Sequence, residues 1–282
     1  MNELEALRQQ SITGVRPLIP GRNIWQGYFG PKHEAVVLKG VFGSTSDSKL
    51  RLEEQLARDI AAHPRNRTEG EICSRVIPSY GIIETAVGPY FVTPRMLPVS
   101  VLLDEGAKSA DVISFLMHGS DAVAAVHCAD KYYNDVKPEN FVLRSLSDAK
   151  AVVIDFGTVT PRTPGANIGI HGTPGYASPQ QLSGLCDARG DVFGLGASAY
   201  KVITGAYAMR PVSAAHLQRI VGEYNADPSK LTAVPSQFTD LPLKAKSLIT
   251  AMLEPKSENR PSLGEVRARA ADALQEISDR TV

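Results

Sequence analysis

Two short polar segments, separated by about the length of one hairpin, constrain this chain more than any other feature. Residues 133–140 read Tyr-Asn-Asp-Val-Lys-Pro-Glu-Asn, and residues 154–157 read Ile-Asp-Phe-Gly. The five fixed letters of Asp-x-Lys-Pro-Glu-Asn are expected by chance in roughly one in ten thousand chains of this length. A generic polar surface loop is therefore a poor explanation of the first segment.

The residues between the two segments predict a hairpin. Short apolar, β-type runs at 141–143 and 151–154 lie on either side of the polar stretch Ser-Leu-Ser-Asp at 145–148. This is the pattern of strand, turn and strand. We expect such a hairpin to place Asn140 and Asp155 near each other at one end.

The two segments resemble the catalytic loop and the metal-binding loop of protein kinases, which read H/Y-R-D-x-K-x-x-N and D-F-G. The resemblance implies ATP and Mg²⁺ as cofactors. Asp135 would orient the acceptor hydroxyl and take its proton, and Lys137 would reach the transferring phosphate. Asn140 and Asp155 would supply oxygen ligands of the kind that Mg²⁺ prefers.

The N-terminal third reads as β-rich, with strand candidates at 16–20, 24–30 and 34–41. The third candidate contains Ala-Val-Val-Leu-Lys, which looks like the V-A-I-K strand of protein kinases. By this resemblance Lys39 would pair with the α- and β-phosphates of ATP, and Val37 would belong to the nucleotide site.

A helix is predicted over 49–62, where protein kinases carry a glutamate that holds the strand lysine. Glu53 and Glu54 are both candidates. Counting back from the His-Pro pair at 63–64 favours Glu54, whereas the apolar pattern favours Glu53, whose neighbours at +3, +4 and +7 are Leu, Ala and Ile. We prefer Glu53 and expect the other acid to be exposed.

Residues 89–93 read as a buried strand that breaks into irregular chain at Pro94. This resembles the last strand of the smaller lobe and the hinge. Thr93 would be the gatekeeper, and adenine would bond the carbonyl of Pro94 and the amide of Met96. Proline can serve at the first position because only its carbonyl is needed. Val142, after the catalytic loop, would also contact the nucleotide.

The remaining two thirds reads mainly helical, beginning with a helix over 109–127. Residues 171–180 look like G-T-P-x-Y-x-A-P-E, 191–196 like D-V-W-S-L-G, and 253–262 like L-x-x-x-P-x-x-R-P-S. Thr173 in this pattern, together with Lys137, resembles the Ser/Thr branch, in which the threonine hydroxyl bonds the catalytic Asp and Lys. Asp191 at the second motif would be structural and bond the catalytic loop's backbone.

Three departures from the family pattern stand out. No G-x-G-x-x-G precedes the lysine strand; a short turn at Gly21, Arg22 and Asn23 would cover the phosphates instead. Asn134 replaces the arginine that, in relatives, pairs with a phosphate on the activation segment, so activity here should not require phosphorylation of that segment. Gln180 replaces the glutamate expected to pair with Arg260.

Composition excludes several other classes. The 282 residues are 43% hydrophobic, enough to bury a large core, and 30 basic and 30 acidic residues give a formal net charge of zero. Neither bulk nucleic-acid binding nor an anionic membrane is indicated. Three scattered cysteines show no zinc or disulfide pattern, and no transmembrane or signal segment is evident. We expect a cytoplasmic site of action, with delivery into another cell left open.

The sequence therefore predicts one domain with the α+β, bilobal fold of protein kinases. A β-rich N-lobe with one helix would span about 12–93, a hinge 94–98, and a larger, mainly helical C-lobe 99–278. The implied function is ATP- and Mg²⁺-dependent phosphorylation of protein Ser/Thr hydroxyls. Two alternatives stay open: a catalytically silent scaffold that binds a nucleotide or a partner, and an enzyme of this fold with a small-molecule acceptor or a nucleotidyl-transfer reaction. The sequence names no protein substrate and no oligomeric state.

Overall fold

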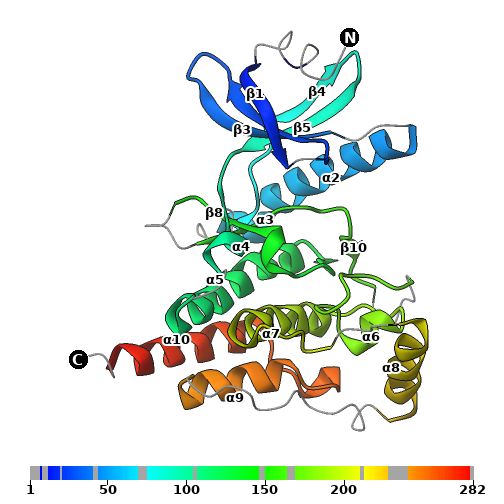
Figure 1. Ribbon diagram of the computed structural model, residues 1–282, viewed down its shortest axis with the longest axis vertical. Coiled ribbons are helices and arrows are strands. Elements are labelled where there is room, and N and C mark those ends of the chain that lie inside the picture. Colours follow the sequence, from blue (N-terminus) through cyan, green and yellow to red (C-terminus); the bar gives the residue numbers. More distant parts are fainter. Residues whose placement is uncertain are drawn as a thin grey trace. The chain divides into compact units, whose positions relative to one another are not determined.

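A computed structural model describes residues 7, 12–19, 21–40, 44–68, 75–103, 107–145, 150–163, 169–209, 213–227 and 241–279. The chain divides into two compact units. One consists of Met1–Met96 together with Asp155–Gly157, and the other of Leu97–Ile154 together with Thr158–Val282. Strands predominate in the first unit and helices in the second (Figure 1), in agreement with the predicted α+β class.

The first unit is built on a five-stranded antiparallel sheet with the order β1-β2-β3-β5-β4. Its strands are β1 (Ile12–Ile19), β2 (Ile24–Phe29), β3 (Glu34–Gly40), β4 (Gly81–Thr85) and β5 (Gly88–Pro94). Helix α2 (Ser44–Ala62) and the short α3 (Pro64–Thr68) connect β3 to β4. Residues 20 and 41, which end two of the predicted strands, lie outside the described residues.

Strand β3 shows how the alternation of a strand sorts its side chains. Val36 and Leu38 are fully buried in an apolar core that also contains residues of β1 and β5. Because successive side chains of a strand point to opposite faces, Val37 and Lys39 lie on the other face of the sheet. The register places Thr93 opposite Val37.

Strand β1 begins at Ile12, four residues before the predicted start. Its register shifts between Thr13 and Arg16, where Gly14 adopts a φ of +60°. The bulge gives the buried residues Ile12 and Val15 a spacing of three, so the period-two pattern that identifies strands is interrupted. Because of that interruption, the sequence pattern identifies only the second half of the strand.

The second unit contains two small sheets and most of the helices. One sheet has the order β6-β8-β9, and the other pairs β7 with β10. The strands are β6 (Leu97–Pro98), β7 (Lys131–Tyr132), β8 (Phe141–Leu143), β9 (Ala151–Val153) and β10 (Thr160–Pro161). Strands β8 and β9 form the antiparallel hairpin predicted from the apolar runs, although residues 146–149 of its turn lie outside the description.

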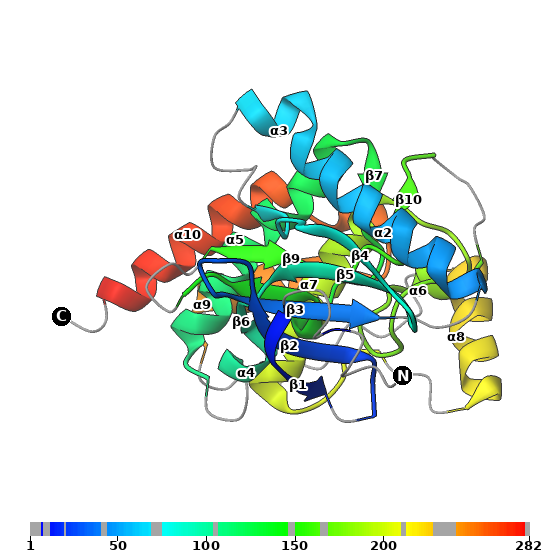
Figure 2. The same ribbon diagram turned by 90° about the horizontal axis from the view of Figure 1, so that it is seen from above.

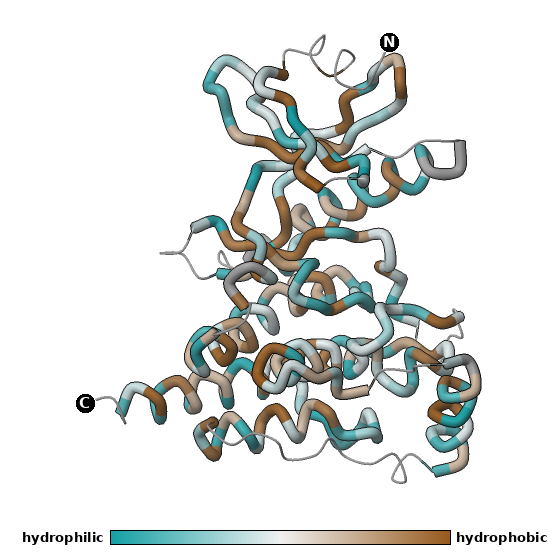
Figure 3. Tube along the Cα trace, viewed as in Figure 1, coloured by the Kyte–Doolittle hydropathy of each residue, from teal (hydrophilic) through white to brown (hydrophobic). Residues whose placement is uncertain are grey.

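The helices of the second unit are α4 (Val99–Leu102), α5 (Ser109–Cys128), α6 (Pro179–Leu182), α7 (Ala188–Thr204), α8 (Ala214–Ala226), α9 (Leu243–Met252) and α10 (Leu263–Asp279). Helix α7 packs against α5 and α9, and α10 packs against the same two helices. Helix α10 lies beside α5 in both views (Figures 1 and 2). Hydrophobic and hydrophilic stretches alternate along α8 and α9, as expected for helices with one buried face (Figure 3).

Helix α7 is buried over its whole central part, from Gly190 to Tyr200. Its glycines permit close approach of other segments. A Cβ atom at Gly194 would lie 2.7 Å from Cβ of Val136, and one at Gly196 would lie 2.8 Å from Cβ of Met252. The helix therefore serves as the support against which the segment around Val136 is positioned.

Candidate active site

The polar segment 133–140 leads from β7 into a one-turn 3₁₀ helix at Pro138–Asn140 and then into β8. Its side chains form a closed ring of hydrogen bonds with Thr173. The Thr173 hydroxyl donates to Oδ1 of Asp135 at 2.6 Å, and Nζ of Lys137 donates to Oδ2 of Asp135 at 2.8 Å and to Oγ1 of Thr173 at 2.6 Å. Two residues separated by 36 positions in the sequence thereby fix the direction of one carboxylate.

Asn140 donates to the same carboxylate, at the oxygen that also accepts from Lys137. Its Nδ2 donates to Oδ2 of Asp135 at 3.0 Å and to the Asp135 carbonyl at 2.8 Å. With the amide nitrogen used in this way, the side-chain oxygen of Asn140 is the atom left for a ligand. Ile154, the residue before Asp155, donates its amide to the Asn140 carbonyl at 3.0 Å.

Asp191 on α7 holds the backbone of this loop. Its fully buried carboxylate accepts the amides of Tyr133 at 2.9 Å and Asn134 at 2.7 Å, and lies 2.7 Å from Nε2 of His127. A buried carboxylate is stable only when its oxygens are well bonded, and three donors meet that need here. The expected structural role of Asp191 is confirmed; its contact with His127 had no signal in the sequence.

Asn134 ties the loop to the segment that follows β9. Its backbone has a φ of +70°, and its buried side chain donates from Nδ2 to the Thr158 carbonyl and to Oγ1 of Thr160, both at 2.9 Å. The Thr158 hydroxyl in turn donates to the Tyr133 carbonyl at 3.2 Å. Asn134 thus makes direct contacts with the following segment, without an intervening charged group.

Arg260 is buried, and it forms no direct ion pair with any residue that the structure describes. Its guanidinium donates to Oε1 of Gln180 at 2.9 Å and to the carbonyls of Glu254, Pro255 and Arg189 at 2.6, 2.8 and 3.0 Å. Burial lowers the pKa of Arg260 to about 10. The neutral amide of Gln180 therefore occupies the position at which a carboxylate was expected.

The amide nitrogen of Gln180 has a second partner. It donates to Oδ1 of Asp187 at 3.3 Å, the oxygen that caps α7 by accepting the Gly190 amide at 2.7 Å. Gln180 is thereby a bridge between Arg260 and Asp187. A carboxylate could accept from the first of these residues but could not donate to the second.

In the first unit, Lys39 on β3 is bonded by two carboxylates. Its Nζ lies 2.8 and 2.9 Å from the two oxygens of Glu53 on α2, and 3.3 Å from Oδ1 of Asp155. Burial acts to lower the pKa of Lys39, but the two carboxylates outweigh it and raise that pKa above its usual value of 10.5. The amide of Phe156 donates to Glu53 at 3.3 Å and so links this helix to the Asp-Phe-Gly segment.

Glu53 is therefore the acid that pairs with Lys39. The expectation that the other acid is exposed was wrong, because Glu54 is only 3% exposed. Glu54 accepts from the Ser79 hydroxyl at 2.5 Å and pairs with Nε of Arg58 at 2.9 Å. Ser79 lies 25 residues further along the chain, so the periodicity of the helix held no information about this partner.

The other residues assigned to nucleotide binding belong to two groups. In the first unit, Val37 lies opposite Thr93 in the sheet, Pro94 ends β5, Met96 is the last residue before β6, and Gly21 begins the turn between β1 and β2 with a φ of +75°. In the second unit, Val142 lies in β8 opposite Val152. The contacts described above bring together Asp135, Lys137, Thr173 and Asn140 in one unit, and Lys39, Glu53 and Asp155 in the other.

The metal assignment can be tested against the donor atoms present. Among the described residues, no group of three or more His, Cys, Asp and Glu side chains could hold a metal ion unaided. Asn140 and Asp155 offer only oxygen ligands, and Mg²⁺ characteristically completes its coordination with waters and substrate phosphates. Each of these two side chains therefore carries a donor of the kind that Mg²⁺ uses together with phosphate ligands.

Comparisons with known proteins address the same region. A family model described as "Protein kinase domain" matches residues 31–272. CBL-interacting protein kinase 8 of Oryza sativa subsp. japonica is 27% identical over 264 residues, which are 88% of this chain and 55% of that protein. Serine/threonine-protein kinase Pkn1 of Myxococcus xanthus is 31% identical over 139 residues, 46% of this chain and 20% of that protein. PknL of Mycobacterium tuberculosis is 32% identical over 136 residues, 46% and 34% respectively.

The alignments thus span about half the length, or less, of these curated relatives. No helix among the described residues is both long enough and apolar enough to cross a bilayer.

Proposed function

Because this chain belongs to the protein kinase family, we propose that it transfers the γ-phosphate of ATP to the hydroxyl of a serine or threonine in a protein substrate. The observation that carries the proposal is the ring formed by Asp135, Lys137 and Thr173, closed by contacts of 2.6 to 2.8 Å. A scaffold that only binds a partner has no chemical need for a carboxylate oriented so closely.

Asp135 acts on the acceptor in this proposal. The bonds from Thr173 and Lys137 to its two oxygens fix the carboxylate, which can then orient the incoming hydroxyl and take its proton. Lys137 carries a positive charge two residues away, where it can stabilise negative charge on the transferring phosphoryl group. Positioning and charge supply most of the catalysis in phosphoryl transfer.

Lys39 acts on the nucleotide. Its pairing with Glu53 holds the ammonium group in place, and we assign it to the α- and β-phosphates of ATP. Asn140 and Asp155 would hold Mg²⁺, which neutralises phosphate charge when bound. We assign the contacts with the rest of the nucleotide to the remaining candidate residues: Gly21, Val37, Thr93, Pro94, Met96 and Val142.

We further propose that the enzyme works without phosphorylation of the segment after β9. In relatives with an arginine before the catalytic aspartate, a phosphate on that segment is the arginine's partner. Here Asn134 already bonds Thr158 and Thr160 directly. A neutral amide gains little from a phosphate, so phosphatase treatment should leave most of the turnover intact.

Two substitutions separate the assigned roles. Asp135→Asn should reduce turnover by about a hundredfold or more, the scale expected for loss of a general base, with ATP affinity near that of the wild type. Lys39→Ala should reduce turnover and also weaken ATP binding, because Lys39 contacts phosphates in the ground state. Glu139→Gln is the matched control, since it removes one exposed carboxylate from the same loop.

The assay uses purified protein, Mg²⁺, a generic protein acceptor such as casein, and ATP labelled at either the γ- or the α-phosphate. Label from the γ-position alone on serine or threonine supports the proposal. Label from the α-position would instead identify nucleotidyl transfer. Normal ATP binding with no transfer to any acceptor would favour the scaffold, and wild-type turnover by Asp135→Asn would refute the role assigned to Asp135.

A further inference from the structure

A buried glutamine on α6 contacts the catalytic loop directly. Gln181 is only 2% exposed, and its side chain bonds in two directions. Oε1 accepts the backbone amide of Ser178 at 2.9 Å and the Ser178 hydroxyl at 3.0 Å, whereas Nε2 donates to the carbonyl of Asn134 at 3.0 Å. Gln181 and Asn134 are 47 positions apart, so no spacing rule connects them.

The contact with Ser178 is a helix cap. Ser178 is the N-cap of α6, and Gln181 stands three residues later, so the two form a capping box. Glutamate and glutamine both serve at this position of a capping box, because the side chain only has to accept the amide of the N-cap residue. Capping alone therefore gives no reason for the amide nitrogen of Gln181.

The contact with Asn134 lies at the peptide bond that leads into Asp135. The Asn134 carbonyl and the Asp135 amide belong to the same peptide group. On the other side of the residue, the Asn134 amide is held by Oδ1 of Asp191 at 2.7 Å. Asn134 itself has a φ of +70°, outside any regular strand or helix. Asp191 thus holds the peptide that enters this residue, and Gln181 holds the peptide that leaves it.

Two glycines let other segments approach this contact. A Cβ atom at Gly190 on α7 would lie 3.1 Å from Cδ of Gln181. A Cβ atom at Gly172 would lie 2.9 Å from the carbonyl oxygen of Asn134. Gly172, with a φ of +87°, comes directly before the threonine of the hydrogen-bonded ring. The carbonyl therefore lies where α6, α7 and the segment that carries this threonine meet.

We propose that Gln181 is a positioning residue for Asp135, and that its amide nitrogen orients the peptide bond from which the Asp135 side chain extends. The role rests on the proposed function, in which Asp135 acts on the acceptor hydroxyl. Without the donor, the buried carbonyl loses a partner and the peptide can rotate toward another one. A displacement of about 1 Å in a catalytic group can reduce the rate by about a hundredfold.

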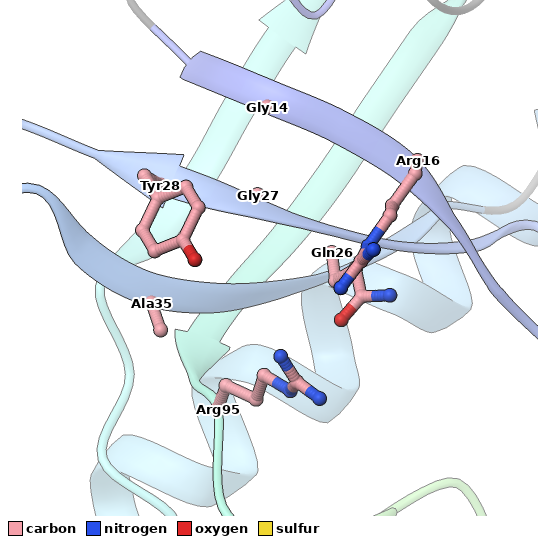
Figure 4. Close-up of a pocket in the computed structure, with 7 residues that line it drawn as sticks. All are labelled: Gly14, Arg16, Gln26, Gly27, Tyr28, Ala35 and Arg95. Atoms are coloured by element: carbon pink, nitrogen blue, oxygen red, sulfur yellow. The ribbon is translucent and has the colours of Figure 1, made fainter.

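Nucleotide binding should not depend on Gln181. The residues of the first unit that we assign to the nucleotide adjoin the hollow drawn in Figure 4. Gln26, which lines the hollow, is paired with Val37. Arg95, which also lines it, follows Pro94 in the chain. The bonds of Gln181 lie within the second unit. The affinity for ATP is therefore an internal control for the effect of Gln181 on turnover.

Three variants separate positioning from capping. Gln181→Glu keeps the acceptor of the capping box but, ionised at pH 8, has no N–H group for the Asn134 carbonyl. Gln181→Met has a similar volume and neither function. Ser178→Ala removes the hydroxyl of the cap and leaves its backbone amide to hold Oε1 of Gln181.

The first measurement is kcat with casein at pH 8, together with the affinity for ATP from titration calorimetry. Both Gln181 variants should lower kcat by about tenfold or more and leave the affinity for ATP within about twofold of the wild type. Ser178→Ala should stay within about twofold in both quantities. Wild-type kcat in either Gln181 variant would overturn the proposal. An equal loss of kcat in Ser178→Ala, or a parallel loss of ATP affinity, would show a structural role and would also overturn it.

The second measurement needs no turnover. In an HNCO spectrum the carbonyl carbon of Asn134 is detected through the amide of Asp135, and loss of a hydrogen bond moves a carbonyl carbon upfield. This signal should move upfield in both Gln181 variants and keep its position in Ser178→Ala, and the dispersion of the same spectra shows that each variant is folded. An unmoved signal in the Gln181 variants would overturn the proposal even if kcat falls. If the wild type transfers no phosphate but the signal moves as expected, the proposed function is refuted and the orienting contact of Gln181 is upheld.

Discussion

Replacing Asn134 should destabilise the protein, because its side chain is hydrogen-bonded to the segment after β9. The side chain makes two bonds of 2.9 Å, to the Thr158 carbonyl and to Oγ1 of Thr160. A typical neutral hydrogen bond contributes about 0.5 to 1.5 kcal/mol net. Both Thr158 and Thr160 are half-buried, so water can take over once the amide is removed. We therefore expect Asn134→Gly to lower the free energy of unfolding by about 2 kcal/mol.

The backbone conformation at this position makes alanine a more destabilising replacement than glycine. With a φ of +70°, Asn134 adopts the left-handed conformation, which asparagine tolerates better than alanine does. Asn134→Ala should therefore cost about 1 kcal/mol more than Asn134→Gly, although alanine is ordinarily the less destabilising of the two. Urea unfolding followed by far-UV circular dichroism, which is dominated by the helices of the second unit, measures both variants.

Thr160→Val supplies the matched control, since it removes the hydroxyl but keeps the shape. It should cost about 1 kcal/mol in the wild type and almost nothing in the Asn134→Gly background, because its partner there is already gone. If Thr160→Val costs the same in both backgrounds, or if Asn134→Gly is as stable as the wild type, the bonds from Asn134 contribute nothing and our account of this segment fails.

Two further predictions concern buried groups. Gln180→Glu should change the free energy of unfolding by less than about 1 kcal/mol, because attraction to Arg260 and repulsion from Asp187 each come to about 4 kcal/mol at an effective dielectric near 20 and oppose each other. In an Asp187→Asn background the repulsion is gone, so the same substitution should stabilise the protein. Urea unfolding that shows the same effect of Gln180→Glu in both backgrounds would refute this. Burial raises the pKa of Cys186 from 9.0 to about 12, so iodoacetamide at pH 8 should modify Cys128 and spare Cys186 in peptide mass mapping. The pKa of Cys186 is higher in the folded protein than in the unfolded chain, so its contribution to the free energy of unfolding is complete below pH 9 and declines toward pH 12. Between pH 9 and 11, Cys186→Ala should therefore lose stability less steeply than the wild type.

Local sequence patterns predicted much of the architecture and the family. The family match confirms the resemblance drawn from residues 133–140 and 154–157. Helix α5 was expected over 109–127 and spans Ser109–Cys128, because its apolar positions follow the helical period. The same kind of periodicity favoured Glu53, since the face of a helix that carries apolar neighbours is the buried face.

What the sequence could not show were contacts between segments distant in the chain. The partner of Glu54 is Ser79, and the partners of Asn134 follow β9, so no spacing rule connects them. From the sequence, Gln180 is only a neutral replacement for the glutamate that would pair with Arg260. The structure adds a second partner, because the Gln180 amide nitrogen donates to Asp187, which a carboxylate could not do. The bulge in β1 was hidden for a different reason: one inserted residue breaks the alternation by which strands are found.

The turn between β1 and β2 has a consequence for the timing of the reaction. Strand β1 ends at Ile19 and β2 begins at Ile24; between them the Arg22 amide donates to the Ile19 carbonyl, and the Asn23 carbonyl accepts the Gly40 amide. A connection this short offers few backbone amides to phosphate oxygens, and it is too short to form a loop that closes over the nucleotide. In the proposed reaction, ADP would then leave as soon as its remaining contacts break. The slow step would shift from product release to phosphoryl transfer itself, and the enzyme would show no burst of product in its first turnover.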